Sequence, residues 1–274
     1  MTRKDAGSRI IVALDVDNVR KATKLVTLLK GEVGGFKIGF EFIYSMLATL
    51  VTANFGDAHA ALNELRMLFE AFDHSEFLDG KIADIPNTIA GAVRAICQLQ
   101  PMMFNMHAFA GSKAMLEARK TLSEVFSKIG MGERPLLLAV TLLTSIDEDG
   151  LVELGLKPED ATTPYRTDLV TRYAKLAHDR DCDGVIASPL EVEAIRQACG
   201  KNFLIYTPGV RLPGSAKHDQ KNVATPGYSI HNGTTGVIIG RDITGAEDPA
   251  AAVELVIDNI LQNTNADEIL TEAM

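Results

Sequence analysis

The stretch FLDGKIADIPNT, residues 77–88, begins with an apolar run and ends in a Pro-Asn-Thr turn. The segment TIAGAVRAICQL, which has helical spacing, starts inside this turn and continues the chain. The pattern predicts a buried strand, EFLDGK at 76–81, followed by a helix, which is the repeating unit of a parallel α/β sheet. The same stretch sets Lys81 between Asp79 and Asp84, so it also raises a question of chemistry.

Seven further short runs rich in β-branched or aromatic residues have the character of buried strands. They are IIVALD (10–15), GFKIG (35–39), MMFNMHA (102–108), LLLAVT (136–141), DGVIAS (183–188), NFLIYTPG (202–209) and GVIIG (236–240). Stretches with helical spacing separate them, which predicts parallel pairing through crossover helices. Eight such units in a chain of this length indicate a (β/α)8 TIM barrel. An open doubly wound sheet is the alternative, but no GxGxxG motif follows the first strand. We therefore expect one barrel domain over residues 1–274, with short tails at 1–9 and about 262–274.

The composition excludes several classes of partner. The 274 residues are 46% hydrophobic and 23% charged, as in ordinary globular proteins, and the formal net charge is -9. This excess of acidic groups disfavours binding to nucleic acid or to an anionic membrane. No apolar run approaches the roughly 18 residues of a membrane span, and the start MTRKDAGSRI has no apolar signal region. Three cysteines without a CxxC pair indicate packed, reduced thiols. We expect a cytoplasmic protein.

Polar residues end nearly every predicted strand. They are Asp15, Lys37, Asp79, Lys81, His107, Thr141 with Thr144 and Ser145, Ser188, Arg211 and Arg241. The active sites of TIM barrels lie at this carboxyl-terminal face, so the distribution predicts a catalytic mouth. We interpret His107 as a packed or hydrogen-bonded strand-end residue rather than as a general base.

Asp79 and Lys81 are two residues apart and therefore point to the same side of their strand. Lys37 on the adjacent strand reaches the same space. Buried charges need partners of opposite sign, and a lysine flanked by carboxylates stays protonated. Taken alone, the pattern D-x-K-x-x-D also fits a surface cluster of ion pairs. With Lys37 and Asp15 at matching positions on neighbouring strands, it indicates a positioned acid.

A phosphate site is predicted near the last two strands, where TIM barrels commonly bind phosphate. The segments involved are TPGVR (207–211), HDQ (218–220) and GVIIGRDIT (236–244). Gly240 permits close approach of the backbone, Arg241 offers a two-pronged donor, and Gln220 adds a neutral donor.

These segments resemble motifs of the orotidine 5'-phosphate decarboxylase family, in the family's order. The matching stretches are ALDVDN (13–18), FKIG (36–39), LDGKIADIPNT (78–88), LLAVTLLTS (137–145), TPGVR with DQ nine positions after its Arg, and IIGRDIT (238–244). The resemblance runs from about residue 10 to 260.

The resemblance implies removal of CO2 from orotidine 5'-phosphate to give uridine 5'-phosphate, without metal or cofactor. By family role, Lys81 would protonate C6 of the pyrimidine, and Asp79 would lie against the departing carboxylate. Lys37 and Asp15 would hold the ribose hydroxyls. Asp84 and Thr88 would reach the site of the partner subunit, which implies a homodimer. The remaining matches imply contacts to the base and the phosphate, from Thr144, Ser145, Pro208, Arg211, Gln220, Gly240 and Arg241.

The chain departs from the family pattern after Gln220, where KNVATP stands in place of an arginine found in many members. The long stretch 45–75 is predicted to be helical, and it either extends a helix or belongs to a dimer surface. Two alternatives share the barrel fold. A metal-dependent sugar-phosphate decarboxylase or aldolase would carry an acidic metal ligand where this chain has Lys37. A non-catalytic nucleotide-binding barrel would have lost catalytic positions that are all present here.

Overall fold

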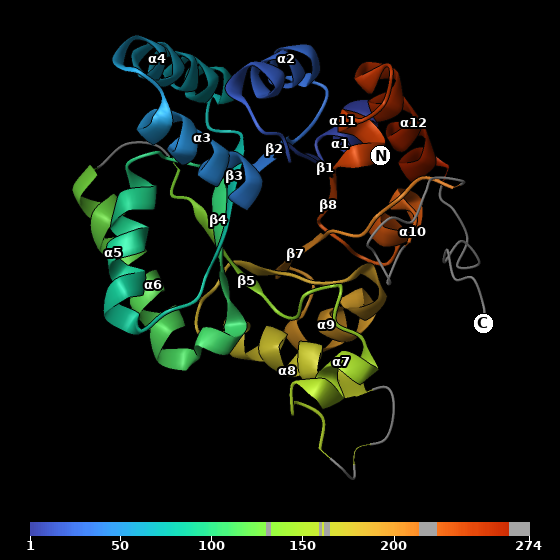
Figure 1. The fold of residues 1–274 in the computed structure, drawn as a ribbon. Coiled ribbons are helices and arrows are strands. Elements are labelled where there is room, and N and C mark those ends of the chain that lie inside the picture. Colours follow the sequence, from blue (N-terminus) through green and yellow to red (C-terminus); the bar gives the residue numbers. More distant parts are fainter. Residues whose placement is uncertain (130–132, 159–160, 162–164, 214–223, 263–274) are drawn as a thin grey trace.

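The computed structural model describes residues 1–129, 133–158, 161, 165–213 and 224–262 of the chain. Eight strands form a closed barrel in sequence order (Figure 1). They are β1 (Ile10–Ala13), β2 (Gly35–Ile38), β3 (Glu76–Ile82), β4 (Met103–His107), β5 (Leu136–Val140), β6 (Gly184–Ile186), β7 (Leu204–Thr207) and β8 (Gly236–Ile239). Each strand pairs in parallel with the next, and β8 closes the ring by pairing with β1. The predicted (β/α)8 barrel is confirmed.

Helices surround the barrel (Figure 1). They are α1 (Arg3–Gly7), α2 (Val19–Leu29), α3 (Phe40–Thr52), α4 (Phe55–Phe72), α5 (Pro86–Cys97), α6 (Ser112–Ile129), α7 (Glu148–Glu153), α8 (Tyr165–His178), α9 (Val192–Cys199), α10 (Pro226–His231), α11 (Arg241–Thr244) and α12 (Pro249–Leu261), with the 3-10 turns η1 (Ala108–Ala110) and η2 (Pro189–Glu191). Local sequence explains where several of them begin. Asn18 and Asn54 cap α2 and α4, because their side chains accept hydrogen bonds from Lys21 N and Asp57 N at 3.0 Å. Pro86 occupies the first turn of α5, where its missing N–H is not needed.

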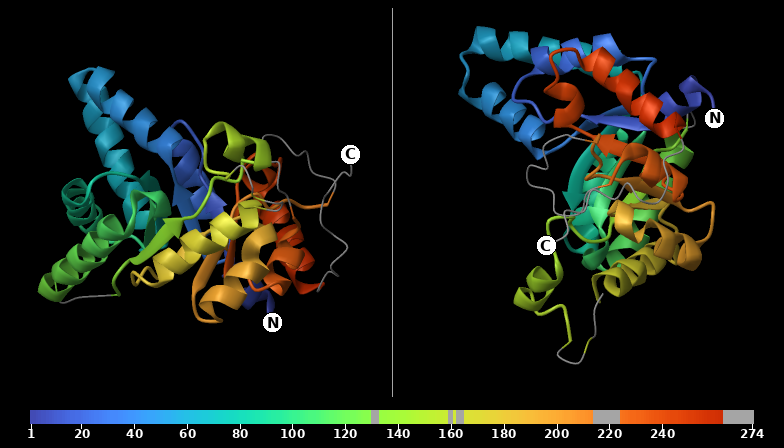
Figure 2. Two further views of the ribbon diagram at one scale, coloured as in Figure 1. Left: turned by 90° about the horizontal axis from the view of Figure 1, so that it is seen from below. Right: turned by 90° about the vertical axis from the view of Figure 1, so that its right-hand side faces the viewer.

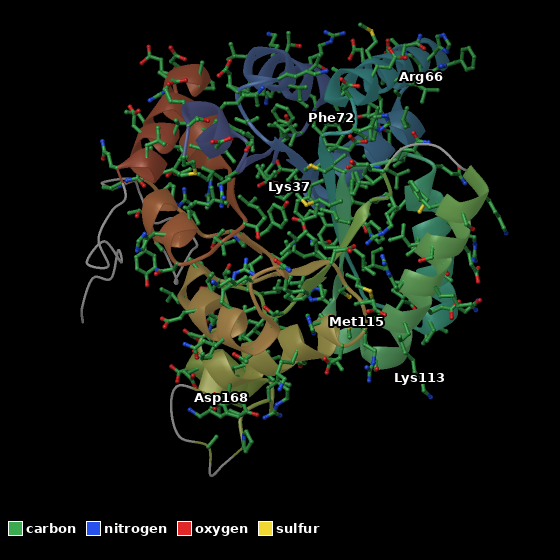
Figure 3. The ribbon with its side chains drawn as sticks, turned by 180° about the vertical axis from the view of Figure 1, so that it is seen from behind. Lys37, Arg66, Phe72, Lys113, Met115 and Asp168 are labelled. Carbon is green, nitrogen blue, oxygen red and sulfur yellow. The ribbon has the colours of Figure 1, made fainter. Side chains whose placement is uncertain are left out.

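The alternation of side chains along each strand produces two apolar layers. One layer fills the inside of the barrel with Ile11, Ala13, Phe77, Met103, Leu138, Val140, Ile186 and Ile238. The second layer packs the outer face of the sheet against the helices. Phe36 and Ile38 belong to this outer layer, so Lys37 between them points into the barrel. Figure 3 shows Lys37 at the centre of the molecule, whereas Arg66 and Lys113 lie at its periphery.

The stretch 45–75 forms most of a helical hairpin, α3 and α4, that extends outward from the barrel (Figure 2). The prediction of helix here is confirmed. Helix α4 is tied to α2 by an ion pair between Arg20 and Glu64 at 2.8 Å. Helix α3 exposes apolar side chains on its outer side, including Tyr44 at 62% and Val51 at 73% of their surface.

The segment 1–9, expected as a short tail, contains α1. Thr2 caps this helix, and the Asp5 carboxylate accepts a hydrogen bond from Thr2 N at 2.9 Å, which completes a capping box. Ala6 and Gly7 of α1 are buried. Residues 263–274, which include most of the expected C-terminal tail, lie outside the described residues.

No helix in the described part of the chain combines the length and the apolar character needed to cross a bilayer. Cys97, Cys182 and Cys199 are free thiols, and all three are buried. Burial raises the pKa of Cys182 to about 12, assisted by the nearby Asp183. These side chains act as packing groups, as the sequence predicted.

Candidate active site

A cavity of about 260 Å³ opens at the carboxyl-terminal ends of the strands. Its lining includes nine of the residues that the sequence singled out, namely Asp15, Lys37, Asp79, Lys81, Thr144, Pro208, Arg211, Gly240 and Arg241. They come from the ends of strands on both sides of the barrel. The closed ring of parallel strands therefore brings together side chains that are more than 200 residues apart in sequence.

Four charged groups form a continuous chain of alternating sign on one wall of this cavity. Lys37 Nζ lies 3.0 Å from Asp15 Oδ1 and 3.0 Å from Asp79 Oδ2. Lys81 Nζ donates to both carboxylate oxygens of Asp79 at 2.7 Å. The two central members, Lys37 and Asp79, are buried, so each is stabilised by its charged neighbours rather than by water.

The pKa values of the central pair follow from this arrangement. Burial alone would lower the pKa of Lys37, but the charges of Asp79 and Asp15 outweigh it, and the pKa is raised. Burial would likewise raise the pKa of Asp79, but Lys37, Lys81 and a hydrogen bond from Asn105 lower it. Both groups are therefore ionised at neutral pH, and the chain keeps its alternating charges.

The backbone of Lys81 has an unusual conformation. Its φ is +40°, in the left-handed region that non-glycine residues rarely adopt. The pairing of β3 with β4 changes register across this point, between Leu78 and Ile82. The side chain of Lys81 is 28% exposed and lines the cavity, with its Nζ 5.8 Å from the ring centroid of Phe40. Lys81 is thus held at the boundary between the buried pair and the open space of the site.

Asn105 on β4 was not identified from the sequence. Its side chain contacts Asp79 and the backbone of Lys81, each at 2.7 Å, and it is 1% exposed. Its position was the available signal. Asn105 is a polar residue inside a strand that is otherwise apolar up to His107. It lies two residues from both Met103 and His107, and residues at this spacing share the inward face. His107 itself does not line the cavity and stacks on Phe109 with 4.7 Å between ring centroids. Burial and the charge of Lys81 lower its pKa, so it is neutral at pH 7, in agreement with a packed role.

The opposite wall carries the arginines. Arg211 is buried and forms an ion pair through Nη1 with Asp242, a residue that the sequence analysis did not single out. Asp242 also accepts a hydrogen bond from Leu212 N at 3.3 Å. This pair fixes the Arg211 guanidinium beside Gly240 and Arg241 in the cavity lining. Gln220 lies outside the described residues.

The segment after β5 contributes Thr144 to the cavity, whereas Ser145 is exposed and is not part of the lining. Arg166 on α8 holds this segment, because its Nη1 donates to the carbonyl oxygens of Leu143 and Ile146. The guanidinium is in turn held by Glu191, with 2.8 Å between Nε and Oε1.

Asp84 and Thr88 do not line the cavity of their own chain, and both are exposed. Asp84 lies two residues after the end of β3 and accepts a hydrogen bond from Ile85 N at 2.6 Å. Within the described residues, no three His, Cys, Asp or Glu side chains are grouped as a metal site requires.

Comparison with known proteins identifies a matching family model, similar sequences and a similar structure. The model of the "Orotidine 5'-phosphate decarboxylase / HUMPS family" matches residues 8–256. The orotidine 5'-phosphate decarboxylase of Trichlorobacter lovleyi is 41% identical over 95% of this chain and 98% of its own length. The enzyme of the same name from Moorella thermoacetica is 40% identical over 95% of both chains. The crystal structure of orotidine 5'-phosphate decarboxylase from Lactobacillus acidophilus superposes with a TM-score of 0.70, at 31% identity over 92% of this chain and 98% of that one.

Proposed function

This chain belongs to the orotidine 5'-phosphate decarboxylase / HUMPS family, and from this premise we propose how its site works. The protein is an orotidine 5'-phosphate decarboxylase, which converts orotidine 5'-phosphate to uridine 5'-phosphate and CO2 in the last step of uridine 5'-phosphate synthesis. The observation that carries the mechanism is the Asp79 carboxylate held between the ammonium groups of Lys37 and Lys81.

The chemistry requires one positioned acid. When the bond between C6 and the carboxylate breaks, its electron pair remains on C6 and CO2 leaves. A carbanion at this ring position is poorly delocalised, so a fixed positive charge beside it lowers the barrier. Lys81 supplies this charge from the cavity wall and then transfers a proton from Nζ to C6. Water returns a proton to the lysine after the product leaves.

Asp79 and Lys37 prepare the site for this step. Asp79 holds Lys81 by two hydrogen bonds of 2.7 Å, so little reorganisation is needed when charge develops. Its carboxylate also faces the position of the substrate carboxylate, whose repulsion is relieved as CO2 departs. Lys37 and Asp15, joined at 3.0 Å, bind the ribose hydroxyls.

Other residues bind the phosphate and the pyrimidine of the nucleotide. Arg241 and Gly240 at the end of β8, with Gln220, bind the phosphate, and Arg211 lies beside them. Thr144 contacts the pyrimidine, with Ser145 beside it in sequence, and Pro208 lies at the base and phosphate end. Binding energy from the distant phosphate contributes to catalysis by holding the base against Lys81.

We further propose that the active unit is a homodimer in which Asp84 and Thr88 complete the site of the partner. Exposed apolar side chains follow three neighbouring strands, β2, β3 and β4, and Asp84 follows the middle one. Phe40 after β2 is 49% exposed, Ile85 after β3 is 67% exposed, and Phe109 after β4 is 61% exposed. Exposed apolar and aromatic side chains of this kind are typical of a subunit interface. The function and the buried free thiols together favour the cytoplasm as its location.

The test of the function uses the purified protein, treated with a chelator and dialysed. Its absorbance is followed with orotidine 5'-phosphate as the substrate. We expect conversion to uridine 5'-phosphate at an undiminished rate. Activity that disappears with the chelator and returns with a divalent metal would support the metal-dependent alternative, and no conversion at all would reject the assigned function.

A further inference from the structure

A bulge in β3 leaves Lys81 without a paired residue on β4. Leu78 pairs with Phe104 and pairing resumes with Ile82 opposite Met106, so residues 79–81 of β3 face the single residue Asn105 of β4. Such a bulge re-aims side chains at the cost of regular ladder hydrogen bonds. It also places Lys81 at φ +40°, a strained conformation that persists only where surrounding contacts enforce it.

The Asn105 side chain supplies the contacts that the bulge removes. Its Oδ1 accepts the hydrogen bond of Lys81 N at 2.7 Å, and its Nδ2 donates to Asp79 Oδ1 at 2.7 Å. The backbone N–H needs an acceptor and the carboxylate needs a donor, and an amide in this orientation satisfies both. The side chain is 1% exposed, so water does not compete for either contact.

We propose that Asn105 is the positioning residue of the active site, and this inference rests on the catalytic roles proposed for Lys81 and Asp79. Asn105 holds the strained backbone of Lys81 through Oδ1 and the Asp79 carboxylate through Nδ2. The position of Lys81 Nζ relative to C6 of the substrate therefore depends on β4, which carries Asn105, as well as on β3. Asn105 does not touch the substrate and is not among the residues that line the cavity.

Two substitutions separate the two contacts. Asn105→Leu keeps a similar volume and removes both hydrogen bonds. Asn105→Asp keeps the acceptor for Lys81 N–H but presents a carboxyl group to Asp79. The other titratable groups on this side of the mouth are Lys81 on β3, Lys37 on β2, Asp15 after β1 and His107 on β4. Two adjacent buried carboxyl groups share a proton at low pH and repel one another once both are ionised.

The experiment compares wild type and both variants by steady-state kinetics, by affinity for uridine 5'-phosphate, and by hydrogen exchange of the Lys81 amide. We expect kcat of Asn105→Leu to fall about 10- to 100-fold, with nucleotide affinity changed less than about threefold. For Asn105→Asp we expect a relative kcat that falls as the pH rises from about 5 to about 8. The Lys81 amide should exchange rapidly in the Leu variant and slowly in the Asp variant.

The same changes at Asn202, an exposed residue on a loop outside the active-site cavity, serve as matched controls and should alter none of these measurements. Unchanged kcat in both Asn105 variants, or equal loss of kcat and nucleotide affinity, would overturn the proposal. If the Leu variant does not fold, the isosteric Asp variant decides by its pH profile. Inactive wild-type protein would instead count against the proposed function, and the exchange of the Lys81 amide would still test the positioning role.

Discussion

Lys37 Nζ lies 3.0 Å from Asp79 Oδ2, across the neighbouring strands β2 and β3. Their side chains point inward from the same edge of the barrel, and each is almost completely removed from water. Neither charge would be stable there alone, because burial of a single ion is strongly unfavourable. The pair therefore forms the fixed part of the site, on which the more exposed Asp15 and Lys81 depend.

The proposed phosphate site at the end of β8 can be tested by a change in KM. Arg241→Ala removes a charged donor from the cavity lining, and a hydrogen bond to a charged group contributes about 1.5 to 3 kcal/mol. We expect KM for orotidine 5'-phosphate to rise about 10- to 100-fold, measured by steady-state kinetics. Arg20→Ala is the matched control, because Arg20 is 78% exposed on α2 and should leave KM unchanged. A normal KM in Arg241→Ala would place the phosphate elsewhere.

The proposed homodimer predicts complementation between inactive variants. Lys81→Ala abolishes the acid of its own site, and Asp84→Ala removes a residue given to the partner's site. A mixed dimer then contains one site with both residues intact and one site with neither. After equal mixing and reassociation, half of the dimers are mixed and half of their sites are active, which predicts about a quarter of wild-type activity. Two inactive variants that stay inactive on mixing would contradict the exchange of Asp84 between subunits.

The buried carboxyl group of Glu76 predicts a pH-dependent stability. Burial raises the pKa of Glu76 from 4.5 to about 7, with Asp73 reinforcing the shift and His74 opposing it. The folded state therefore binds a proton that the unfolded state releases, so stability is greatest at low pH and falls as the pH rises from about 4.5 to about 7. Above that range, ionised Glu76 destabilises the fold by at most about 3 kcal/mol.

Glu76→Gln should relieve this effect. We expect the melting temperature of the variant to exceed that of wild type at about pH 8 and to match it at about pH 5. Glu193→Gln, an exposed change on α9, is the control. Differential scanning calorimetry at both pH values makes the measurement, and a stabilisation that does not depend on pH would show that the Glu76 carboxyl group is not responsible.

Arg166 and Glu191 predict a strong coupling in stability. Arg166→Met leaves Glu191 buried without its partner, and removal of one member of a buried pair costs about 3 to 5 kcal/mol. Replacing both residues by Met and Leu should restore most of the lost stability, measured by denaturant unfolding. The double variant should still have a raised KM, because the segment carrying Thr144 has lost the donor to Leu143 and Ile146. Additive losses in the double variant would show that the two side chains are not coupled.

The sequence predicted the barrel and most of the site because both depend on short-range patterns. Apolar runs predicted all eight strands to within a few residues, and period-two alternation placed Asp79 with Lys81. The contact between Lys37 and Asp79 was predicted because the carboxyl ends of the strands converge in a barrel.

Most of the missed features depend on contacts between residues that are distant in sequence. Asn105 lies within a strand rather than at its end, and its role arises from a bulge in the neighbouring strand. Thr144 lines the cavity and Ser145 does not, because the distant Arg166 fixes the segment after β5. Helix α1 had a local signal, the capping box between Thr2 and Asp5, but it is too short to show a periodic apolar face.

The account depends most on Lys81 as the acid that meets the C6 carbanion. The direct measurement is a pair of values for Lys81→Ala, namely kcat with orotidine 5'-phosphate and the dissociation constant of uridine 5'-phosphate. We predict loss of turnover below detection, because no other described ammonium group in the cavity wall is as open to the substrate, while the nucleotide still binds within about tenfold of wild type. A variant with tight binding and near-normal turnover would remove Lys81 from the reaction and contradict the mechanism.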